Sequence, residues 1–204
     1  MAYPTIDAPY GFRPVNLLGG QVFAGSTRQM AIASGHATNI FFGDIVIMSA
    51  NGCINNATLT DSAVQVAGIF MGCSYINSSS QRVFGQYYPA TITQTVDSAN
   101  GTVAYVADDP DLVMKVAIVS GTTTMSGKDR AGLVGATAAW VANAGSTITG
   151  DSKQAILSTT GTATTLPLKV IDVVPDTINS ASSFTEVLVT WTGLVHMYRG
   201  AAGI

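Results

Sequence analysis

The densest group of chemically capable side chains is Asp108-Asp109-Pro110-Asp111, which places three carboxylates within four residues. Carboxylate oxygens are the ligands that Ca²⁺ prefers, but the spacing of an EF-hand loop and its central glycine are absent. Asp and Pro also favour tight turns. The segment therefore has three interpretations. The composition favours a turn, and the alternatives are an ion-pairing site between subunits and a metal site.

A second segment, residues 121–129, shares some features with a phosphate-binding loop. Five residues separate Gly121 from Gly127, where the motif has four. Asp129 stands where a Ser or Thr must reach the magnesium ion. The sequence therefore predicts an ordinary loop here.

The two cysteines, Cys53 and Cys73, and the two histidines, His36 and His196, could together supply four zinc ligands. No pair among them has a ligand spacing such as C-x-x-C or H-x-x-x-H, so we expect no metal and no cofactor. The first residues lack the basic and apolar segments of a secretory signal. We therefore expect both cysteines to be reduced core residues, with a disulfide that closes a hairpin as the alternative.

Catalytic groups are scarce, because Glu186 is the only glutamate in 204 residues. General acid–base catalysis needs two carboxylates held in different environments, and no such pair stands out. A G-x-S-x-G motif is absent, and nothing in the sequence supports a catalytic triad. We expect a protein that is not an enzyme.

Charged residues make up 10% of the chain, far below the roughly 25% of ordinary globular domains. The apolar content of 47% excludes general disorder. Either Ser and Thr hydroxyls hydrate the surface, or partners cover much of it, and we favour partners. The net charge of −3 gives no reason to expect nucleic acid or an anionic membrane. Apolar runs stay well short of the roughly 18 residues that a membrane span needs.

Segments rich in β-branched and aromatic residues recur along the chain, joined by turns that carry Gly, Asn and Pro. Two turns are Asn-Gly pairs, Asn51-Gly52 and Asn100-Gly101, a strong hairpin signal. The pattern predicts an all-β fold, an antiparallel β-barrel or sandwich with long loops and little helix. The expected strands are 22–32, 45–48, 53–57, 64–76, 83–88, 91–96, 102–106, 112–119, 168–174 and 186–198.

Two of these strands carry more detailed expectations. The continuous apolar run in 64–76 predicts a strand buried on both faces, with bulges or close backbone approach at Gly68 and Gly72. The alternation in 186–198 predicts a half-buried strand with Trp191 on its apolar face. We expect strand and loop over 128–144 and a surface excursion over 146–165.

We divide the chain into an extended N-terminal arm, residues 1–20, and a β-rich domain, residues 21–204. A break near 120–160 would separate two sub-domains. The arm contains three prolines, which block regular structure. It either docks on another chain or packs on its own domain.

The candidate partner contacts combine the arm with the acidic segment. Aromatic side chains and Arg are enriched in protein interfaces. Carboxylates can form ion pairs across a subunit contact. The candidates are Tyr3, Tyr10, Phe12, Arg13, Asp108, Asp109 and Asp111.

Short β and turn motifs resemble those of tailed-bacteriophage head proteins, encoded near the major capsid protein, that serve as capsid decoration or cement proteins. The resemblance covers most of the chain in patches and is weakest between about 120 and 160. The motifs are 8–15 (APYGFRPV), 32–40 (IASGHATNI), 43–46 (GDIV), 66–75 (VAGIFMGCSY), 88–90 (YPA), 106–113 (VADDPDLV) and 166–170 (LPLKV).

The resemblance implies a β-rich homo-oligomer, with a trimer favoured over a dimer, on the outer surface of the virion capsid. Its partner would be the major capsid protein of the same phage, and it would reside in the host cytoplasm before assembly. On this interpretation, deleting residues 1–14 leaves a folded oligomer that binds the shell weakly, whereas loss of folding would place the arm in the core. The alternatives are another virion part, in the tail, neck or fibre, and a carbohydrate-binding β module. The aromatic platform of such a module would be Tyr87, Tyr88, Trp140 and Trp191.

Overall fold

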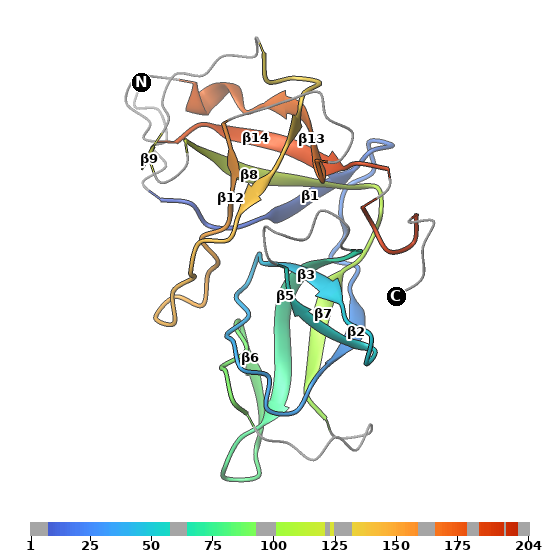
Figure 1. Cartoon of the computed structure of the whole chain (residues 1–204), viewed down its shortest axis with the longest axis vertical. Coiled ribbons are helices and arrows are strands. Elements are labelled where there is room, and N and C mark those ends of the chain that lie inside the picture. The colour runs from blue at the N-terminus through green and yellow to red at the C-terminus, as the bar shows by residue number, and fades with distance from the viewer. Residues whose placement is uncertain are drawn as a thin grey trace.

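The computed structural model describes residues 8–57, 65–92, 101–120, 123–124, 132–158, 166–178, 184–193 and 195–199. Strands dominate these ranges and form two lobes stacked along the long axis (Figure 1). The one helical element in them is a single 3-10 turn, η1 (Pro175–Thr177). The prediction of an all-β fold is confirmed. Within the same ranges, no helix has the length and apolar character to cross a membrane.

The lower lobe in Figure 1 is a six-stranded sheet, which we call the barrel. Its strand order is β3-β4-β2-β7-β5-β6, and β3 also pairs with β5, so the pairings close into a ring that β6 extends. The β2–β4 pairing is parallel and the others are antiparallel. The strands are β2 (Arg28–Ile32), β3 (Ile45–Met48), β4 (Cys53–Asn56), β5 (Val66–Ile76), β6 (Arg82–Gly85) and β7 (Val103–Ala107).

The upper lobe is an eight-stranded sheet built around β8, which we call the β8 sheet. Its order is β10-β13-β14-β8-β12-β11, with β1 and β9 also paired to β8. Only the β8–β12 pairing is parallel among its described strands. The strands are β1 (Arg13–Leu17), β8 (Leu112–Ser120), β9 (Thr123–Thr124), β10 (Thr137–Ala138), β11 (Trp140–Val141), β12 (Ala155–Leu157), β13 (Leu168–Val173) and β14 (Glu186–Trp191).

Strand β5 matches its sequence pattern, because nearly all of its first nine residues are buried. Gly68 has φ 149°, and a Cβ added there would lie 2.2 Å from the carbonyl oxygen of Ala107. The pairing of β5 with β7 shifts register between Phe70 and Cys73, around Gly72. The predicted bulges and close backbone approach are confirmed.

The β3–β4 hairpin at Asn51-Gly52 is also confirmed, since Gly52 has φ 76° and donates to the carbonyl of Ser49. Asn100 of the second Asn-Gly turn lies outside the described residues. Both cysteines are free: Cys73 is buried in β5 and Cys53 is half-buried in β4. Burial raises the pKa of the Cys73 thiol to about 12. Cys73 is therefore a reduced core residue, as predicted.

The expected half-buried strand 186–198 is wrong in two respects. Strand β14 ends at Trp191, where the ladder reaches Pro167: the N–H of Thr192 donates to the carbonyl of Pro167, but proline has no N–H to return the bond. Residues on both faces of β14 are buried, and the strand is paired on both edges, with β13 and with β8. Its polar side chains find partners inside the fold, such as the carbonyl of Leu112 for Thr190.

The expected surface excursion 146–165 contains a core strand. Ala155 and Ile156 of β12 are fully buried, and β12 pairs in parallel with β8. A three-residue strand is too short to show a period in the sequence, so its burial comes from its neighbours. The expected strand 22–32 is shorter, beginning at Arg28. Most of 91–96 and of the loop 121–129 lies outside the described residues.

The described part of the expected arm is not an arm. Residues 13–17 form β1, which pairs antiparallel with β8, and Phe12 is fully buried in the core. Pro14 is tolerated because the β1–β8 register shifts between Pro14 and Asn16. Deleting residues 1–14 would therefore remove core contacts, so loss of folding is now the expected result. The chain passes from the β8 sheet to the barrel between β1 and β2 and returns at residues 108–111 between β7 and β8, so neither of these crossings lies within 120–160.

We expect Trp191→Ala to lower the free energy of unfolding by about 3–5 kcal/mol, the range for large aromatic truncations in cores. Trp191 is only 4% exposed and belongs to the core of the β8 sheet. Chemical denaturation measures the loss. Ile148→Ala is the control, because Ile148 is 95% exposed and should change stability by less than about 0.5 kcal/mol. A loss below about 1 kcal/mol for Trp191→Ala would contradict its place in the core.

Candidate functional site

Three loops meet where the lobes join, and we call this region the lobe junction. The backbone N–H of Phe12 donates to the carbonyl of Gly43 at 2.9 Å. Two further backbone hydrogen bonds join Phe42 to the loop before β12. The N–H of Phe42 donates to the carbonyl of Gly150, and the N–H of Ser152 donates to the carbonyl of Phe42, both at 3.0 Å. The N-terminal segment, the loop before β3 and the loop before β12 are therefore joined through their backbones.

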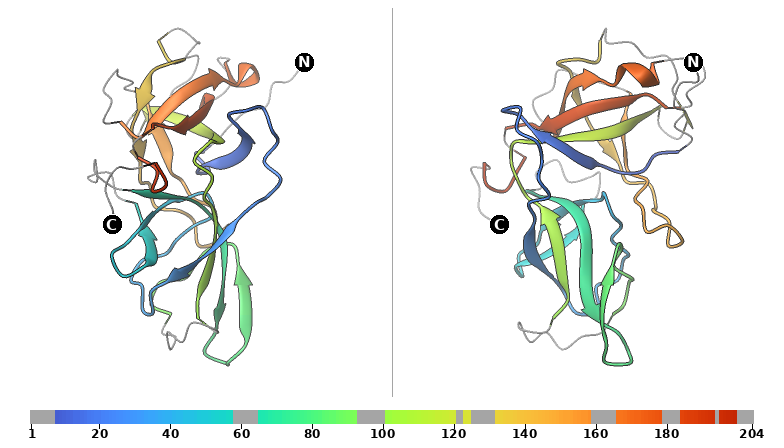
Figure 2. Two further views of the ribbon diagram at one scale, coloured as in Figure 1. Left: turned by 90° about the vertical axis from the view of Figure 1, so that its right-hand side faces the viewer. Right: turned by 180° about the vertical axis from the view of Figure 1, so that it is seen from behind.

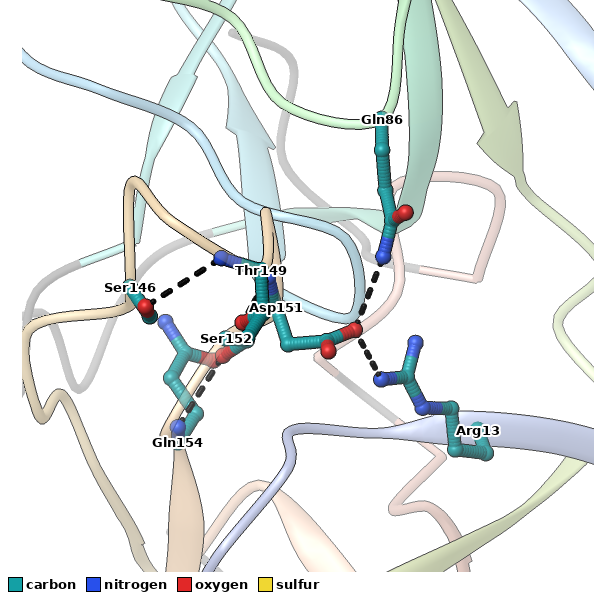
Figure 3. Close-up of polar contacts among 7 residues, drawn as sticks. All are labelled: Arg13, Gln86, Ser146, Thr149, Asp151, Ser152 and Gln154. Carbon is teal, nitrogen blue, oxygen red and sulfur yellow. Dashed lines mark hydrogen bonds and ion pairs between the residues drawn. The ribbon is translucent and has the colours of Figure 1, made fainter.

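Asp151 is the polar centre of the lobe junction (Figure 3). Its Oδ1 lies 2.7 Å from Nη2 of Arg13 and accepts a hydrogen bond from Nε2 of Gln86 at 2.9 Å. Arg13 begins β1 in the β8 sheet, whereas Gln86 follows β6 in the barrel. The Arg13 guanidinium also lies over the ring of Phe42, 4.3 Å from its centroid. A single carboxylate thus ties both lobes together.

The loop that carries Asp151 is folded by its own polar groups (Figure 3). The Ser146 hydroxyl accepts from the N–H groups of Ile148 and Thr149, each at 3.3 Å. The N–H of Gly150 donates to the carbonyl of Ser146, and the N–H of Ser146 donates to that of Asp151. This tight turn leaves Ile148 at its tip, almost fully exposed.

Asp44 and Gln154 are buried polar residues beside Asp151. Gln154 accepts from the N–H of Ile45 at 2.9 Å, which fastens β3 to the loop before β12. Asp44 accepts from the N–H of Phe41 at 2.8 Å. Burial raises the pKa of Asp44 to about 6, although hydrogen bonds from Ser152 and Phe41 oppose the rise. The lobe junction therefore contains a carboxyl group that titrates under mildly acidic conditions.

The only glutamate of the chain anchors the N-terminal segment to the β8 sheet. The Tyr10 hydroxyl donates to Oε1 of Glu186, and Nζ of Lys115 lies 3.1 Å from the same oxygen. Burial is the main cause that raises the pKa of Tyr10 well above its usual range, and the Glu186 hydrogen bond adds to it. A phenol in this state stays protonated, so Tyr10 serves as the hydrogen-bond donor that holds the N-terminal segment on the β8 sheet.

The acidic segment forms the link between β7 and β8. Oδ1 of Asp109 accepts a hydrogen bond from the N–H of Asp111 at 2.8 Å. This bond closes a turn, as the sequence of the segment predicts. Asp108 pairs with Arg28 and Asp111 with Arg199, both at 2.5 Å. Within the described part of the chain, His, Cys, Asp and Glu side chains form no group of three that could hold a metal ion.

The predicted contact residues fall into separate places and mostly have partners within the chain. Phe12 is in the core, Tyr10 is bonded to Glu186, and Arg13 is paired with Asp151. The three aspartates lie in the link. Tyr3 lies outside the described residues. The sequence analysis missed Asp151 and Gln86, which carry no motif. Glu186 had a signal, since it is the only glutamate and stands inside a strand pattern.

The aromatic platform of a carbohydrate-binding module is not presented at the surface. Tyr88, Trp140 and Trp191 are buried. Tyr87 is partly buried and stacks on Phe41, with ring centroids 5.6 Å apart. These rings therefore pack within the fold.

No protein-family model, curated protein or solved structure matches the chain. Its function is therefore inferred from its composition, from the short motifs of its sequence and from the side chains that the structure exposes.

We expect Asp151→Ala to lower the free energy of unfolding by about 1–2 kcal/mol, because it removes a charge-assisted bond that is only partly exposed. The change also removes the ion pair of Arg13, whose Nη1 is buried without a hydrogen-bond partner among the described residues. Chemical denaturation measures the effect, with the exposed Lys153→Ala as control. Equal effects of the two substitutions would mean that the ion pair does not stabilise the lobe junction.

We expect the free energy of unfolding of Asp44→Asn to increase, relative to that of the wild type, as the pH rises from 4 to 7. The folded pKa of about 6 exceeds the reference value of 3.8. Asp44 therefore contributes stability that is full below pH 3.8 and is lost as the pH rises through 6. The change in relative unfolding free energy should be about 2–3 kcal/mol. Denaturation curves across this pH range test it, and a constant difference between the two proteins would refute it.

Proposed function

We propose that this chain is a non-enzymatic structural protein of a tailed-phage virion that binds the outside of the capsid shell and cements neighbouring major capsid subunits. Its subunits form a homo-oligomer, a trimer in preference to a dimer, made in the host cytoplasm before assembly. The proposal involves neither nucleic acid nor a membrane. Among these features, the association with the capsid protein is the one that the following observations support.

The observation that carries the proposal is how few charges remain to hydrate the surface. The chain has 21 charged residues among its 204 (9 basic and 12 acidic). Many of them are engaged in ion pairs or hydrogen bonds within the chain, some of them at the surface, among them Arg13, Arg28, Asp44, Asp108, Asp111, Lys115, Asp151, Glu186 and Arg199. A surface with so few free charges is better suited to being covered by other subunits than to being surrounded by water.

Among the described residues, the most exposed large apolar side chains are Val22, Phe84 and Ile148. Val22 is 75% exposed after the turn that follows β1, and Phe84 is 72% exposed on the edge strand β6. Ile148 lies at the tip of the loop before β12 and is still more exposed. Apolar side chains on edges and loop tips can be buried when a partner docks.

The shape of the molecule suits a bridging role. Figure 2 shows the two lobes end to end in both further views, so the molecule is elongated. Such a body can contact two neighbouring capsid subunits at once. If the chain binds only the assembled shell, its binding free energy stabilises that shell. Many symmetric contacts of modest strength then add up to a large total binding free energy.

We expect Phe84→Ser and Ile148→Ser each to weaken binding to capsid shells about tenfold, the effect of losing roughly 1.4 kcal/mol of apolar contact. Both side chains are exposed, so the folded chain should keep its stability. Co-sedimentation of the purified chain with shells assembled without it measures the affinity. Ser79→Ala, at an exposed turn position, is the control.

Cryo-electron microscopy of the particle locates the chain. Density on the outer shell between neighbouring capsid subunits would support the proposal. Density confined to the tail, neck or fibre would assign the chain to another virion part. A particle without the chain would refute the proposal altogether.

A further inference from the structure

Residues 195–199 connect the β8 sheet back to the barrel, and we call them the C-terminal strap. They follow β14 and lie between the lobes, drawn in red in Figure 1. The N–H of Val66 donates to the carbonyl of Val195 at 2.8 Å, and the N–H of Met197 donates to that of Val66 at 3.0 Å. His196 therefore forms a parallel bridge with Val66 at the start of β5.

The imidazole of His196 is fully buried at this bridge. Its ring centroid lies 6.1 Å from that of Trp191 and 5.2 Å from that of Tyr198. Nδ1 accepts a hydrogen bond from the N–H of Tyr198 at 3.4 Å, which places the proton of the neutral ring on Nε2. Nε2 is buried and has no partner within the described part of the chain.

A second proton on this ring would have to bind Nδ1. That atom would then be a donor facing the N–H of Tyr198, so the one hydrogen bond of the ring would be lost. The imidazolium would also be a buried charge without a direct hydrogen-bond acceptor. The closed position of the strap is therefore built for the neutral imidazole.

The charged groups around His196 come from the link, the strap and β2. Asp108, Asp109 and Asp111 favour the charged ring, and Arg199 opposes it. These carboxylates are already engaged: Asp108 by Arg28 and the Tyr198 hydroxyl, Asp111 by Arg199, and Asp109 by the backbone of Asp111. From β5 and β14, His196 meets the backbone of Val66 and the indole of Trp191. Burial outweighs the carboxylates and lowers the pKa of His196 to about 4.

We propose that the C-terminal strap is a latch released by acid. Protonation of His196 at Nδ1 detaches residues 195–199 from the start of β5 and separates Tyr198 and Arg199 from the link. The two lobes then lose one of their connections while each keeps its own sheet. The lobe junction around Asp151 continues to hold them together. The proposal is independent of the capsid role, because it concerns the isolated chain.

The direction of the pH effect follows from the two protonation states. His196 has a pKa of about 4 in the closed strap, against a reference value of 6.5. The closed state is therefore fully favoured above pH 6.5 and loses that advantage as the pH falls towards 4. Within this window the ratio of closed to open strap should fall by up to about tenfold per pH unit.

Hydrogen exchange of the full-length chain, corrected for intrinsic rates, tests the proposal between pH 7 and 5. The amides of Val66 and Met197 should lose about tenfold or more of their protection, while amides of β8 keep theirs. His196→Gln should remove the pH dependence, because Gln does not titrate. His36→Gln, a partly buried histidine in the barrel, should leave it unchanged.

Three results would overturn the latch. Protection of Val66 and Met197 that does not change with pH would show that the strap stays closed. The same pH dependence in His196→Gln would assign the effect to another group. Simultaneous exchange of the β8 amides would mean global unfolding. If His196→Gln does not fold, NMR titration of the wild-type imidazole decides instead: a pKa at or above 6.5 for His196 overturns the proposal.

Discussion

The carboxylate of Asp151 is the polar contact around which the junction of the two lobes is built. It joins Arg13 of the β8 sheet to Gln86 of the barrel, and its own loop pairs through the backbone with Phe42 (Figure 3). Because the guanidinium also lies over Phe42, one polar cluster fixes three segments at once. The larger hydrophobic core runs across the lobes, since Ile45, Val66 and Ile69 of the barrel pack with residues of the β8 sheet, and the barrel has a second core of its own. Apolar packing and this polar cluster therefore fix the orientation of the lobes together.

Charged and titratable groups are concentrated where distant segments meet. Glu186 binds the N-terminal segment, Asp44 lies at the lobe junction, and His196 lies in the C-terminal strap, where it bridges to Val66. Burial moves the pKa of Asp44 up and that of His196 down, so acid favours the first contact and opposes the second. These two groups therefore respond to pH in opposite directions.

This internal use of charge is consistent with the proposed role at the capsid surface. Because many of the few charged side chains are paired within the chain, apolar and hydroxyl groups make up much of the surface. Such groups suit contact with neighbouring subunits. The closed ring of the barrel leaves few free strand edges, which limits uncontrolled pairing between copies before assembly. Specific contact would then come from exposed side chains such as Phe84 and Ile148, not from open sheet edges.

The sequence by itself determined the features that depend on neighbouring residues: the all-β class, the hairpin at Asn51-Gly52 and the doubly buried β5 with its glycine bulges. Local periodicity and turn chemistry are sufficient for these. Tertiary structure alone decided that residues 13–17 form a strand, that β12 is buried and that β14 ends at Trp191. It also brought together Arg13 and Asp151, 138 positions apart. The physical reason is that these features take their partners from distant segments, and a strand of three residues or a lone carboxylate has no local pattern that specifies its partner.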